Sequence, residues 1–450
     1  MIKLGIKEAA RLAGGTANGD GEITSVVIDS RKVVPGSLYI AIKGQRLDGH
    51  AFVAEACEKG AAAVMAHADC DCSVPVIRVE DTTAALLRFA GAYRDMFTPF
   101  LIGLTGSVGK TSTKDMTACA LSDSRKTIKT DGNLNNHIGM PLNLLRLDET
   151  VEAAVIEMGM NARGEISRLT RAAKPDAALI TNIGISHIGM LGSRREILNA
   201  KMEITEGIKQ GGTLIVNGDD DMLSTVSAPS GLRLVRYSLL GDEFVSGRIV
   251  REGDAHSEVR VKTASGEYDM IVPACGRHNV YNALGAFTAA IVAGAEPESA
   301  IRGIAEFRPA AMRQSVYERN GVTVIEDCYN AAPDSMSAAI SLLSKTGSGR
   351  RIAIFSDMVE LGDYSPAAHE RVGREAASVA DCVMAYGRFA DDYRRGYESV
   401  SDRRGAIEVF GDKQELTKAL KENVREGDTV LFKASRAQRL EEVIEAVFPH

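Results

Sequence analysis

The sharpest pattern in the sequence is a glycine-rich loop, TGSVGKT at residues 105–111. It follows the continuous apolar run 100–104, which is typical of a buried strand in a parallel sheet, and it precedes a helical pattern over 113–122. In this order the glycines let backbone N–H groups face an anion, and the start of the helix adds positive charge. The pattern therefore predicts an α/β domain whose first strand and helix hold a phosphate group.

Individual residues of this loop have distinct expected roles. Lys110 would reach the β- and γ-phosphates of a nucleotide, and Thr111 would offer its hydroxyl to Mg²⁺. The longer form of the motif has glycine six residues before the lysine, where this sequence has Leu104, so the loop is of the shorter GxxGKT type. A loop of that type also occurs as an ordinary turn before a helix, but the buried strand before it favours nucleotide binding. The predicted ATP contacts of the loop are Thr105, Gly106, Ser107, Gly109, Lys110 and Thr111.

The length of 450 residues predicts more than one domain, since it is about three times a usual domain of ~150 residues. Residues 1–98 have the pattern of a small α/β unit, with strands near 23–30 and 36–44 and a helix over 51–66. A new series of alternating strands and helices begins near Thr98-Pro99. We therefore expect a separate N-terminal domain that ends there.

The rest of the chain predicts two further α/β domains. Residues 99–310 alternate strands and helices as in a doubly wound parallel sheet, and residues 230–275 within them have the alternation and turns of an antiparallel flap. Residues 311–450 show the same alternation of strands and helices, which predicts a Rossmann-like C-terminal domain. The expected elements are strands at 153–159, 177–184, 213–220, 351–358, 381–387, 406–410 and 428–435, and a helix at 279–295.

Composition and charge exclude several classes of protein. Hydrophobic residues make up 45% and charged residues 25% of the chain, as in folded globular proteins. The 53 basic and 60 acidic residues give a net charge of −7 with no long basic run, so we expect no nucleic-acid partner. No stretch reaches the ~18 apolar residues of a membrane span, and the start has no cleavable apolar core, so we expect no membrane insertion and a cytoplasmic location. The seven cysteines include no pair of CxxC elements, and we expect them to be reduced.

Two further polar residues end predicted strands of the central domain. Glu157 ends the run that starts at Ala153, and His187 follows the next run. The carboxyl ends of parallel strands form the edge where α/β sheets carry their sites. A carboxylate there can join Thr111 around Mg²⁺, and an imidazole can serve a second cation. Glu157 and His187 are therefore candidate metal ligands, and a solvated acid and a structural histidine are the alternatives.

Three segments together resemble the ATP-dependent Mur ligases of bacterial peptidoglycan synthesis. They are TGSVGKTSTK at 105–114, DGNLNNHIGMP at 131–141 and IEMG at 156–159. Further matches run to the C-terminus, so the resemblance covers nearly the whole chain. The 131–141 stretch and the segment 327–331 are most similar to the members that add D-alanyl-D-alanine to a UDP-N-acetylmuramoyl-tripeptide. The DNPR element of the members that add the third residue is absent.

The resemblance implies an enzyme that forms an amide bond. ATP would activate the tripeptide carboxylate as an acyl phosphate with release of ADP, and the amine of D-alanyl-D-alanine would then displace phosphate. In the family the lysine that matches Lys201 is carbamylated, which turns a cation into an anionic ligand of a second Mg²⁺. Without the resemblance, Lys201 would be interpreted as a snorkelling surface lysine. The implied catalytic residues are Lys110, Glu157, His187 and Lys201, and the implied metal ligands are Thr111, Glu157, His187 and Lys201.

The resemblance also assigns binding residues to all three domains, with the third domain closing over ATP. Two positions depart from the family pattern, because Ala332 replaces the second asparagine of Asn-Ala-Asn-Pro and Ala434 replaces the glycine of KGSR. From the residues alone, Asn279 and Asn282 share one helix face, and His278 with Asn279 could instead cap that helix. The implied UDP-sugar contacts are Ser30, Arg31, Lys43, Asp48, Gly49 and His50, the further ATP contacts are Asn279, Asn282, Arg313, Asp327 and Asn330, and the dipeptide contacts are Lys433, Ser435 and Arg436.

Two other functions stay open at this point. A folylpolyglutamate or cyanophycin synthetase relative would share the loop and Lys201, but the Asp29-Ser30-Arg31 segment argues against folate. A P-loop regulatory ATPase would bind phosphate without acyl chemistry, and Glu157, His187 and Lys201 together would then have no explanation. We expect a monomer, and the third residue of the tripeptide cannot be inferred from so few contacts.

Overall fold

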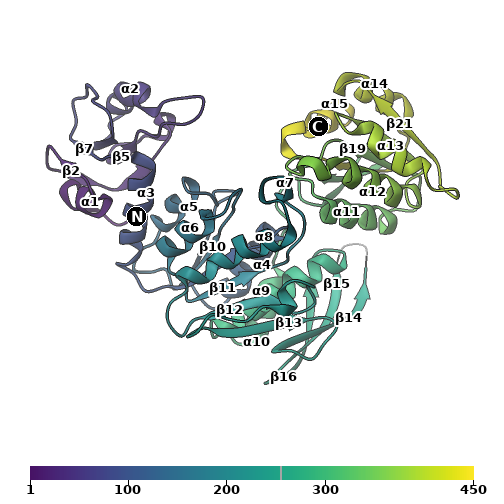
Figure 1. The fold of residues 1–450 in the computed structure, drawn as a ribbon, viewed down its shortest axis with the longest axis horizontal. Helices are drawn as coiled ribbons and strands as arrows, with labels where there is room; N and C mark the ends of the chain where they lie inside the picture. The colour runs from purple at the N-terminus through teal and green to yellow at the C-terminus, as the bar shows by residue number, and fades with distance from the viewer. Residues whose placement is uncertain (254–255, 450) are drawn as a thin grey trace.

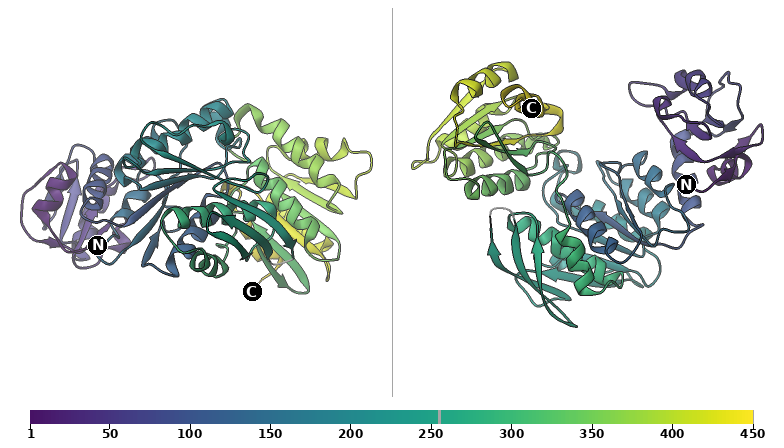
Figure 2. Two further views of the ribbon diagram at one scale, coloured as in Figure 1. Left: turned by 90° about the horizontal axis from the view of Figure 1, so that it is seen from below. Right: turned by 180° about the vertical axis from the view of Figure 1, so that it is seen from behind.

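The computed structural model describes residues 1–253 and 256–449, and these form three α/β units in chain order. Figure 1 shows the N-terminal unit in purple and the C-terminal unit in yellow-green at opposite ends of the molecule, with the central unit between them. Both views in Figure 2 agree with that arrangement. The predicted fold class is confirmed, whereas the exact domain boundaries stay a prediction. Residues 254–255 of the predicted flap, and residue 450, lie outside the described residues.

The N-terminal unit contains a five-stranded sheet in the order β2-β7-β6-β5-β4, parallel except at β2. A two-stranded antiparallel ladder pairs β1 with β3. Helices α1 and α3 pack together, and α3 leads into the central unit. The elements are β1 (Leu4–Gly5), α1 (Ile6–Ala13), β2 (Thr16–Ala17), β3 (Glu22–Ile23), β4 (Ser25–Val27), β5 (Ser37–Ile40), α2 (Val53–Glu58), β6 (Ala63–Ala66), β7 (Val76–Arg78) and α3 (Thr82–Arg94).

The helix predicted over 51–66 is wrong in its second half. Helix α2 ends at Glu58, and the alanine-rich stretch after it is strand β6, which pairs with β5 and β7. Gly60 has a φ of +91°, a left-handed conformation that suits glycine at the end of a helix. All four residues of β6 are buried. Burial in the middle of a parallel sheet therefore overrides the helix preference of alanine.

The central unit contains a nine-stranded sheet in the order β16-β15-β14-β13-β12-β11-β8-β10-β9. Its strands are parallel from β9 through β14, and β14, β15 and β16 form an antiparallel meander. The predicted flap is therefore the antiparallel edge of this sheet, while β13 belongs to its parallel part. The strands are β8 (Phe100–Thr105), β9 (Thr127–Lys129), β10 (Ala153–Glu157), β11 (Ala177–Ile180), β12 (Thr213–Asn217), β13 (Arg233–Ser238), β14 (Val245–Glu252), β15 (Ser257–Thr263) and β16 (Gly266–Val272).

The helices of the central unit position the glycine-rich loop at residues 105–111, which we call the phosphate loop. Helix α4 follows β8 directly after that loop and packs against α9 and α10. The helix predicted over 279–295 forms as α9, and most of its residues are buried. No helix among residues 1–253 and 256–449 is long and apolar enough to cross a membrane. The helices are α4 (Lys110–Ser122), α5 (Gly139–Leu144), α6 (Glu165–Ala173), α7 (Ile188–Leu191), α8 (Arg194–Met202), α9 (Arg277–Val292) and α10 (Pro297–Ala305).

The C-terminal unit contains a six-stranded sheet in the order β17-β18-β22-β19-β20-β21. All pairs are parallel except β17 with β18, and the four strands predicted from the sequence are β19 to β22. The elements are β17 (Ser315–Arg319), β18 (Val322–Asp327), α11 (Pro333–Lys345), β19 (Arg351–Phe355), α12 (Ser365–Ala377), β20 (Cys382–Tyr386), α13 (Ala390–Glu398), β21 (Ala406–Phe410), α14 (Lys413–Asn423), β22 (Thr429–Lys433) and α15 (Glu441–Val447).

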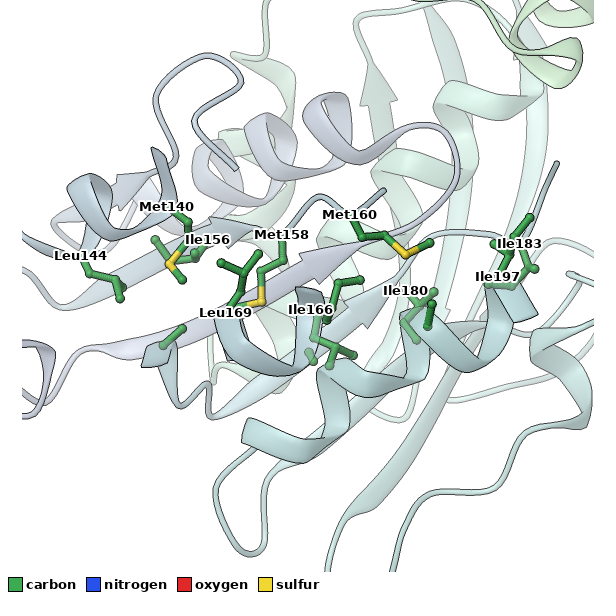
Figure 3. Close-up of a cluster of buried hydrophobic side chains, with 14 of the residues drawn as sticks. Met140, Leu144, Ile156, Met158, Met160, Ile166, Leu169, Ile180, Ile183 and Ile197 are labelled. Atoms are coloured by element: carbon green, nitrogen blue, oxygen red, sulfur yellow. The ribbon is translucent and has the colours of Figure 1, made fainter. Parts of the chain in front are cut away.

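A buried apolar cluster supports the carboxyl ends of two central strands. In Figure 3, side chains of α5, α6 and α8 meet those on and just after β10 and β11. Close packing of this kind fixes the backbone that emerges from the strands. The polar residues that follow β10 and β11 therefore start from a rigid edge. The labelled members are Met140, Leu144, Ile156, Met158, Met160, Ile166, Leu169, Ile180, Ile183 and Ile197.

Candidate active site

The phosphate loop follows β8, and its path depends on two glycines. Gly109 precedes α4 with a φ of +79°, in the left-handed region that favours glycine. A Cβ atom on Gly109 would lie 2.4 Å from Asn282 Oδ1, and one on Gly106 would lie 1.8 Å from Thr181 Oγ1. The backbone therefore passes closer to its neighbours than a side chain at either position would allow. Helix α4 starts at Lys110, so the positive end of the helix faces the loop.

Two residues after β11 hold the loop in place. The amide of Val108 donates to Asn182 Oδ1 at 3.0 Å, and the carbonyl of Val108 accepts from Thr181 Oγ1 at 2.7 Å. The amide of Ser107 donates to the carbonyl of Asn182 at 3.0 Å. Thr181 and Asn182 were not predicted from the sequence. Their position after a predicted strand was a signal, but only the pairing of β11 with β8 places them on the loop.

Two lysines share one acceptor inside the loop. Lys110 Nζ donates to the Gly106 carbonyl at 2.8 Å, and Lys201 Nζ donates to the same oxygen at 2.9 Å. Lys201 lies on α8 and is 1% exposed, which excludes its interpretation as a surface lysine. Burial, assisted by the charge of Lys110, lowers the pKa of Lys201 well below its usual value, and burial also lowers the pKa of Lys110. The site therefore favours a neutral amine on Lys201.

Glu157, at the end of β10, faces the first turn of α4. Its Oε2 accepts from Thr111 Oγ1 at 3.1 Å, and its Oε1 accepts from Asn135 Nδ2 at 2.7 Å. Glu157 is 1% exposed, so the alternative of a solvated strand-end acid is wrong. A buried carboxylate is costly unless it is hydrogen-bonded or bound to a cation. Asn135 lies in the 131–141 stretch but was not predicted as a site residue.

His187 meets the C-terminal unit at the same end of the cleft. It stands just before α7 with a φ of +65°, and its Nδ1 lies 2.8 Å from Glu360 Oε2. The contact with His187 lowers the pKa of the Glu360 carboxyl. Glu360 was not predicted from the sequence, because nothing in its local pattern indicates that it reaches another domain.

These polar groups fit magnesium that binds together with a nucleotide. The Thr111 hydroxyl and the Glu157 carboxylate are oxygen ligands of the kind that Mg²⁺ prefers. In the described part of the chain, no group of three or more His, Cys, Asp and Glu side chains is arranged to hold an ion. Magnesium at nucleotide sites commonly binds one or two carboxylates and takes its other ligands from phosphates and water. A site with few protein ligands is therefore expected for a magnesium ion that binds together with ATP.

The first turns of α9 form a polar face beside the loop. Asn282 Nδ2 donates to Asn279 Oδ1 at 3.2 Å, so the two asparagines share a face as predicted. Asn279 Nδ2 donates to Gln314 Oε1 at 2.9 Å, and His278 Nε2 lies 2.9 Å from the same oxygen. Burial lowers the pKa of His278. The residue that precedes α9 is Gly276, without a side-chain cap, so the capping interpretation of His278 and Asn279 is wrong.

The C-terminal unit contributes a second set of charged groups. The guanidinium of Arg313 stacks 4.1 Å above the ring of Tyr329. Asp327 Oδ2 and Lys433 Nζ lie 2.8 Å apart, and both side chains are buried. Lys433 Nζ also donates to the carbonyl of Asn330 at 2.8 Å. Four residues predicted to contact ATP or the dipeptide therefore gather at the carboxyl ends of β18 and β22.

Residues 433–436, the KASR segment, lie partly at the cleft and partly in the interior of the C-terminal unit. Lys433 and Arg436 line the cleft, and Arg436 forms an ion pair with Glu441. Ser435 is buried, and its Oγ accepts a hydrogen bond from the Val359 amide at 3.0 Å. The structure therefore does not bring Ser435 to the cleft with the other two.

A cleft of about 1270 Å³ lies between the central and C-terminal units and collects most of these side chains. Its size suits a nucleotide and a second small substrate. Thr105, Gly106 and Lys201 lie behind its wall. The predicted site residues that line it are Ser107, Gly109, Lys110, Thr111, Glu157, His187, Asn279, Asn282, Arg313, Asp327, Asn330, Lys433 and Arg436.

The predicted UDP-sugar residues form a separate group in the N-terminal unit. Helix α2 contacts both segments that carry them, and Ser30 Oγ donates to Glu55 Oε2 of α2 at 2.7 Å. Asp48 Oδ1 accepts from the His50 amide at 3.0 Å, and Arg31 is exposed. None of the six residues Ser30, Arg31, Lys43, Asp48, Gly49 and His50 lines the cleft between the other two units.

The fold and the site define a P-loop enzyme whose nucleotide site is completed by a second domain. Comparison with known families shows that the chain belongs to the Mur ligase family. The family's catalytic domain matches residues 22–94, the Mur ligase middle domain matches 104–290, and the glutamate ligase domain matches 312–436. The match to the Mur ligase middle domain therefore includes the phosphate loop, Glu157, His187 and Lys201.

Individual relatives are similar over nearly their full length. The UDP-N-acetylmuramoyl-tripeptide--D-alanyl-D-alanine ligase of Bacillus subtilis is 39% identical, with 99% of this chain and 98% of that protein covered. The crystal structure of MurF from Acinetobacter baumannii has a TM-score of 0.90 at 29% identity, with 98% of both chains covered. MurF from Thermotoga maritima in complex with ADP has a TM-score of 0.82 at 28% identity, with 94% of this chain and 96% of that chain covered.

Proposed function

We propose that this protein joins D-alanyl-D-alanine to UDP-N-acetylmuramoyl-tripeptide at the expense of ATP, as a step of peptidoglycan precursor synthesis. The observation that carries the proposal is the identity of 39% with a ligase of that name over 99% of the chain. The site is consistent with the reaction, because a phosphate loop, a buried carboxylate and a buried lysine meet at one sheet edge.

The reaction needs an activated acyl group, because a carboxylate does not react with an amine at neutral pH. A carboxylate oxygen of the tripeptide attacks the γ-phosphorus of ATP, the bond to the β-phosphate oxygen breaks, and ADP leaves. The unprotonated amine of the dipeptide then attacks the acyl carbon, loses a proton, and expels inorganic phosphate. Lys110 and Arg313 would stabilise charge on the transferring phosphoryl group, since both line the cleft.

Thr111, Glu157 and His187 would hold magnesium with the nucleotide phosphates. The metal would supply Lewis-acid stabilisation of the phosphate oxygens. The chain itself orients Glu157, because Asn135 holds one carboxylate oxygen and leaves Oε2 beside the Thr111 hydroxyl. The Asn279 and Asn282 face of α9, together with Asp327 and Asn330, would hold the rest of the nucleotide. The six UDP-sugar residues of the N-terminal unit would hold one of the two substrates to be joined, and Lys433 and Arg436 would hold the other.

Lys201 would act as a carbamate. A neutral lysine amine attacks carbon dioxide and loses a proton, which gives an anionic group with two oxygens. Only the unprotonated amine reacts, and burial beside Lys110 favours that form. Without the carbamate, the amines of Lys110 and Lys201 donate to the same carbonyl oxygen. With it, a negative charge on Lys201 would face Lys110 and a second magnesium ion.

The carbamate has its own test. Lys201→Ala should be nearly inactive, and a short carboxylate such as formate or acetate should restore part of the activity by filling the vacated volume. Restoration separates loss of a metal ligand from loss of folding. Full activity of Lys201→Ala, or no effect of the carboxylate on a folded variant, would contradict the carbamate.

The function is tested by supplying all three substrates. Purified protein with ATP, UDP-N-acetylmuramoyl-tripeptide and D-alanyl-D-alanine should release phosphate and form a product whose mass equals the sum of both substrates less one water. Omission of the dipeptide should stop phosphate release. ATP hydrolysis without product would favour a regulatory ATPase, and product only with a folate acceptor and glutamate would favour a folylpolyglutamate synthetase. We further propose that the protein is cytoplasmic, since its substrates are ATP and a nucleotide-linked precursor.

A further inference from the structure

One contact joins the central and C-terminal units directly beside the phosphate loop. His187, before α7, and Glu360, after β19, lie 2.8 Å apart between Nδ1 and Oε2, and both line the cleft. The Gly189 amide also donates to the Glu360 carbonyl at 3.3 Å. A Cβ atom on Gly189 would lie 2.6 Å from the amide nitrogen of Gly362, so the two segments touch through their backbones.

Both partners have backbone conformations that are uncommon for their residue types. His187 has a φ of +65° and Glu360 a φ of +72°, and each is therefore in the left-handed region without being glycine. Such conformations cost free energy and persist where the surroundings hold them, often at functional sites. The pair is therefore a specific contact rather than a chance meeting of two exposed side chains.

The contact determines which imidazole nitrogen is available to an ion. Nδ1 of His187 is buried, and Glu360 is the carboxylate within reach of it. Nδ1 lies at hydrogen-bond distance from Oε2, but the two atoms do not form an aligned hydrogen bond in this structure. When Nδ1–H donates to a carboxylate, the neutral imidazole keeps its lone pair on Nε2. Metal-binding histidines are commonly oriented by such an outer carboxylate.

Glu360 is also tied to the segment that carries Lys433 and Arg436. The amide of its neighbour Val359 donates to Ser435 Oγ at 3.0 Å, and the Ser435 amide donates to the Asp357 carbonyl at 3.3 Å. The position of Glu360 therefore depends on the loop after β22, on one side, and on His187, on the other. Ser435, which does not reach the cleft, has its structural role in this connection.

We propose that Glu360 is a positioning residue that fixes His187 in the Nδ1–H tautomer, so that the histidine of the central unit can ligate magnesium only when the C-terminal unit is docked. The proposal rests on the proposed ligase function for the identity of the ion. It goes beyond that function because it assigns a role to Glu360 through its contact with His187. Docking of the unit that carries the dipeptide segment would thereby be coupled to completion of the metal site.

The tautomer is tested by NMR on the full-length protein with ¹⁵N-labelled histidine. His187→Gln identifies the signals of that ring. Without any substrate, we expect the wild-type ring to carry its proton on Nδ1, and we expect Glu360→Met, which keeps side-chain length but removes the acceptor, to show the Nε2–H form or a mixture. The same Nδ1–H signal in Glu360→Met would overturn the proposal.

Metal binding gives a second readout that does not depend on turnover. With ADP present, Mn²⁺ binding measured by electron paramagnetic resonance should weaken by about 10- to 100-fold in Glu360→Met. Glu360→Gln should stay within about threefold of wild type, because its amide oxygen still accepts from Nδ1–H. Asp363→Ala removes an exposed carboxylate from the same segment and should bind Mn²⁺ as wild type does.

The outcomes separate this proposal from the proposed function. Equal Mn²⁺ affinity in wild type and a folded Glu360→Met overturns the role of Glu360, even if the protein is a ligase. Equal weakening in Glu360→Gln and Glu360→Met also overturns it, since a hydrogen-bond acceptor alone should suffice. Absence of ligation by the wild type contradicts the function, while the tautomer measurement still decides whether Glu360 orients His187. If Glu360→Met does not fold, Glu360→Ala, which also removes the acceptor, takes its place in both measurements.

Discussion

Lys110 and Lys201 illustrate how single residues acquire their chemistry from their surroundings. Both amines donate to the Gly106 carbonyl, and burial lowers the pKa of each. Lys110 lines the cleft, where phosphates would favour its positive charge, whereas Lys201 does not line the cleft. Two residues of the same type therefore have different expected charges within one site.

We expect Lys110→Ala to abolish ligation while the protein stays folded. The substitution removes a positioned charge from the phosphoryl group and little packing, and loss of one such contact costs about 10²-fold or more in rate. Phosphate release and product mass measure the first part, and thermal unfolding measures the second. Lys262→Ala, which removes an exposed lysine paired with Asp242, is the matched control and should behave as wild type. Wild-type turnover in Lys110→Ala would contradict the assignment of the loop.

His369 should make the protein less stable in mild acid. Its Nε2 accepts from the Met358 amide at 2.9 Å, its Nδ1 lies 2.6 Å from the Ser365 carbonyl, and burial lowers its pKa. The folded state thus resists protonation that the unfolded chain accepts near pH 6.5. The contribution of His369 to the free energy of unfolding is fully present above about pH 6.5. It falls as the pH drops from there toward the lowered pKa of the folded state.

Urea unfolding between pH 7 and pH 5 checks this expectation. His369→Gln should be less stable at pH 7 but should lose less stability than wild type over that range, because the protonation of His369 in the unfolded chain contributes at most about 1.4 kcal/mol per pH unit. A slope of the same sign remains from His278, whose pKa burial also lowers. Parallel curves for wild type and His369→Gln would contradict the assignment.

Helix packing decides stability at the scale of elements. Helix α10 lies against α4 at Gly303, where a Cβ atom would stand 2.1 Å from the Cys119 carbonyl oxygen. The close approach keeps α4 in place, and α4 begins at the phosphate loop. A glycine inside a helix weakens the helix, so its presence here indicates that the contact matters more.

Gly303→Ala should therefore destabilise the protein, although alanine is the better helix former. The propensity gain is about 1 kcal/mol, whereas overpacking against backbone costs about 1–3 kcal/mol, so we expect a net loss. Urea unfolding monitored by circular dichroism gives the free energy of unfolding. Gly241→Ala, an exposed position where a Cβ atom would lie 3.5 Å from its nearest neighbour, should change it little. A stabilised Gly303→Ala would show that α10 can move away from α4.

At the scale of the whole molecule, the predicted substrate residues stand far apart in the chain and on different units. The UDP-sugar group belongs to the N-terminal unit, the phosphate loop to the central unit, and Lys433 and Arg436 to the C-terminal unit. Figure 1 shows the first and third of these units at opposite ends of the molecule. Joining substrates held by all three requires the units to approach one another.

We expect small-angle X-ray scattering to show a smaller radius of gyration with a non-hydrolysable ATP analogue and UDP-N-acetylmuramoyl-tripeptide than without them. Bound substrates would bridge the units and favour the compact arrangement. The nucleotide analogue alone, and the tripeptide alone, show which unit moves. Identical scattering in all four samples would contradict closure.

The sequence by itself determined the local parts of this protein. The glycine loop between an apolar run and a helix required a strand–loop–helix unit, and regular apolar patterns gave α9 and the strands β19 to β22, because such patterns record which face is buried. Glu157 was a candidate because it ends a predicted strand, whereas Lys201 was a candidate only through the resemblance to the Mur ligases. Tertiary structure decided the rest. Ala63–Ala66 became a strand because sheet partners bury it. Asn182 and Glu360 reached the site through sheet order and domain contact, which relate residues far apart in the chain and leave no mark on the local pattern.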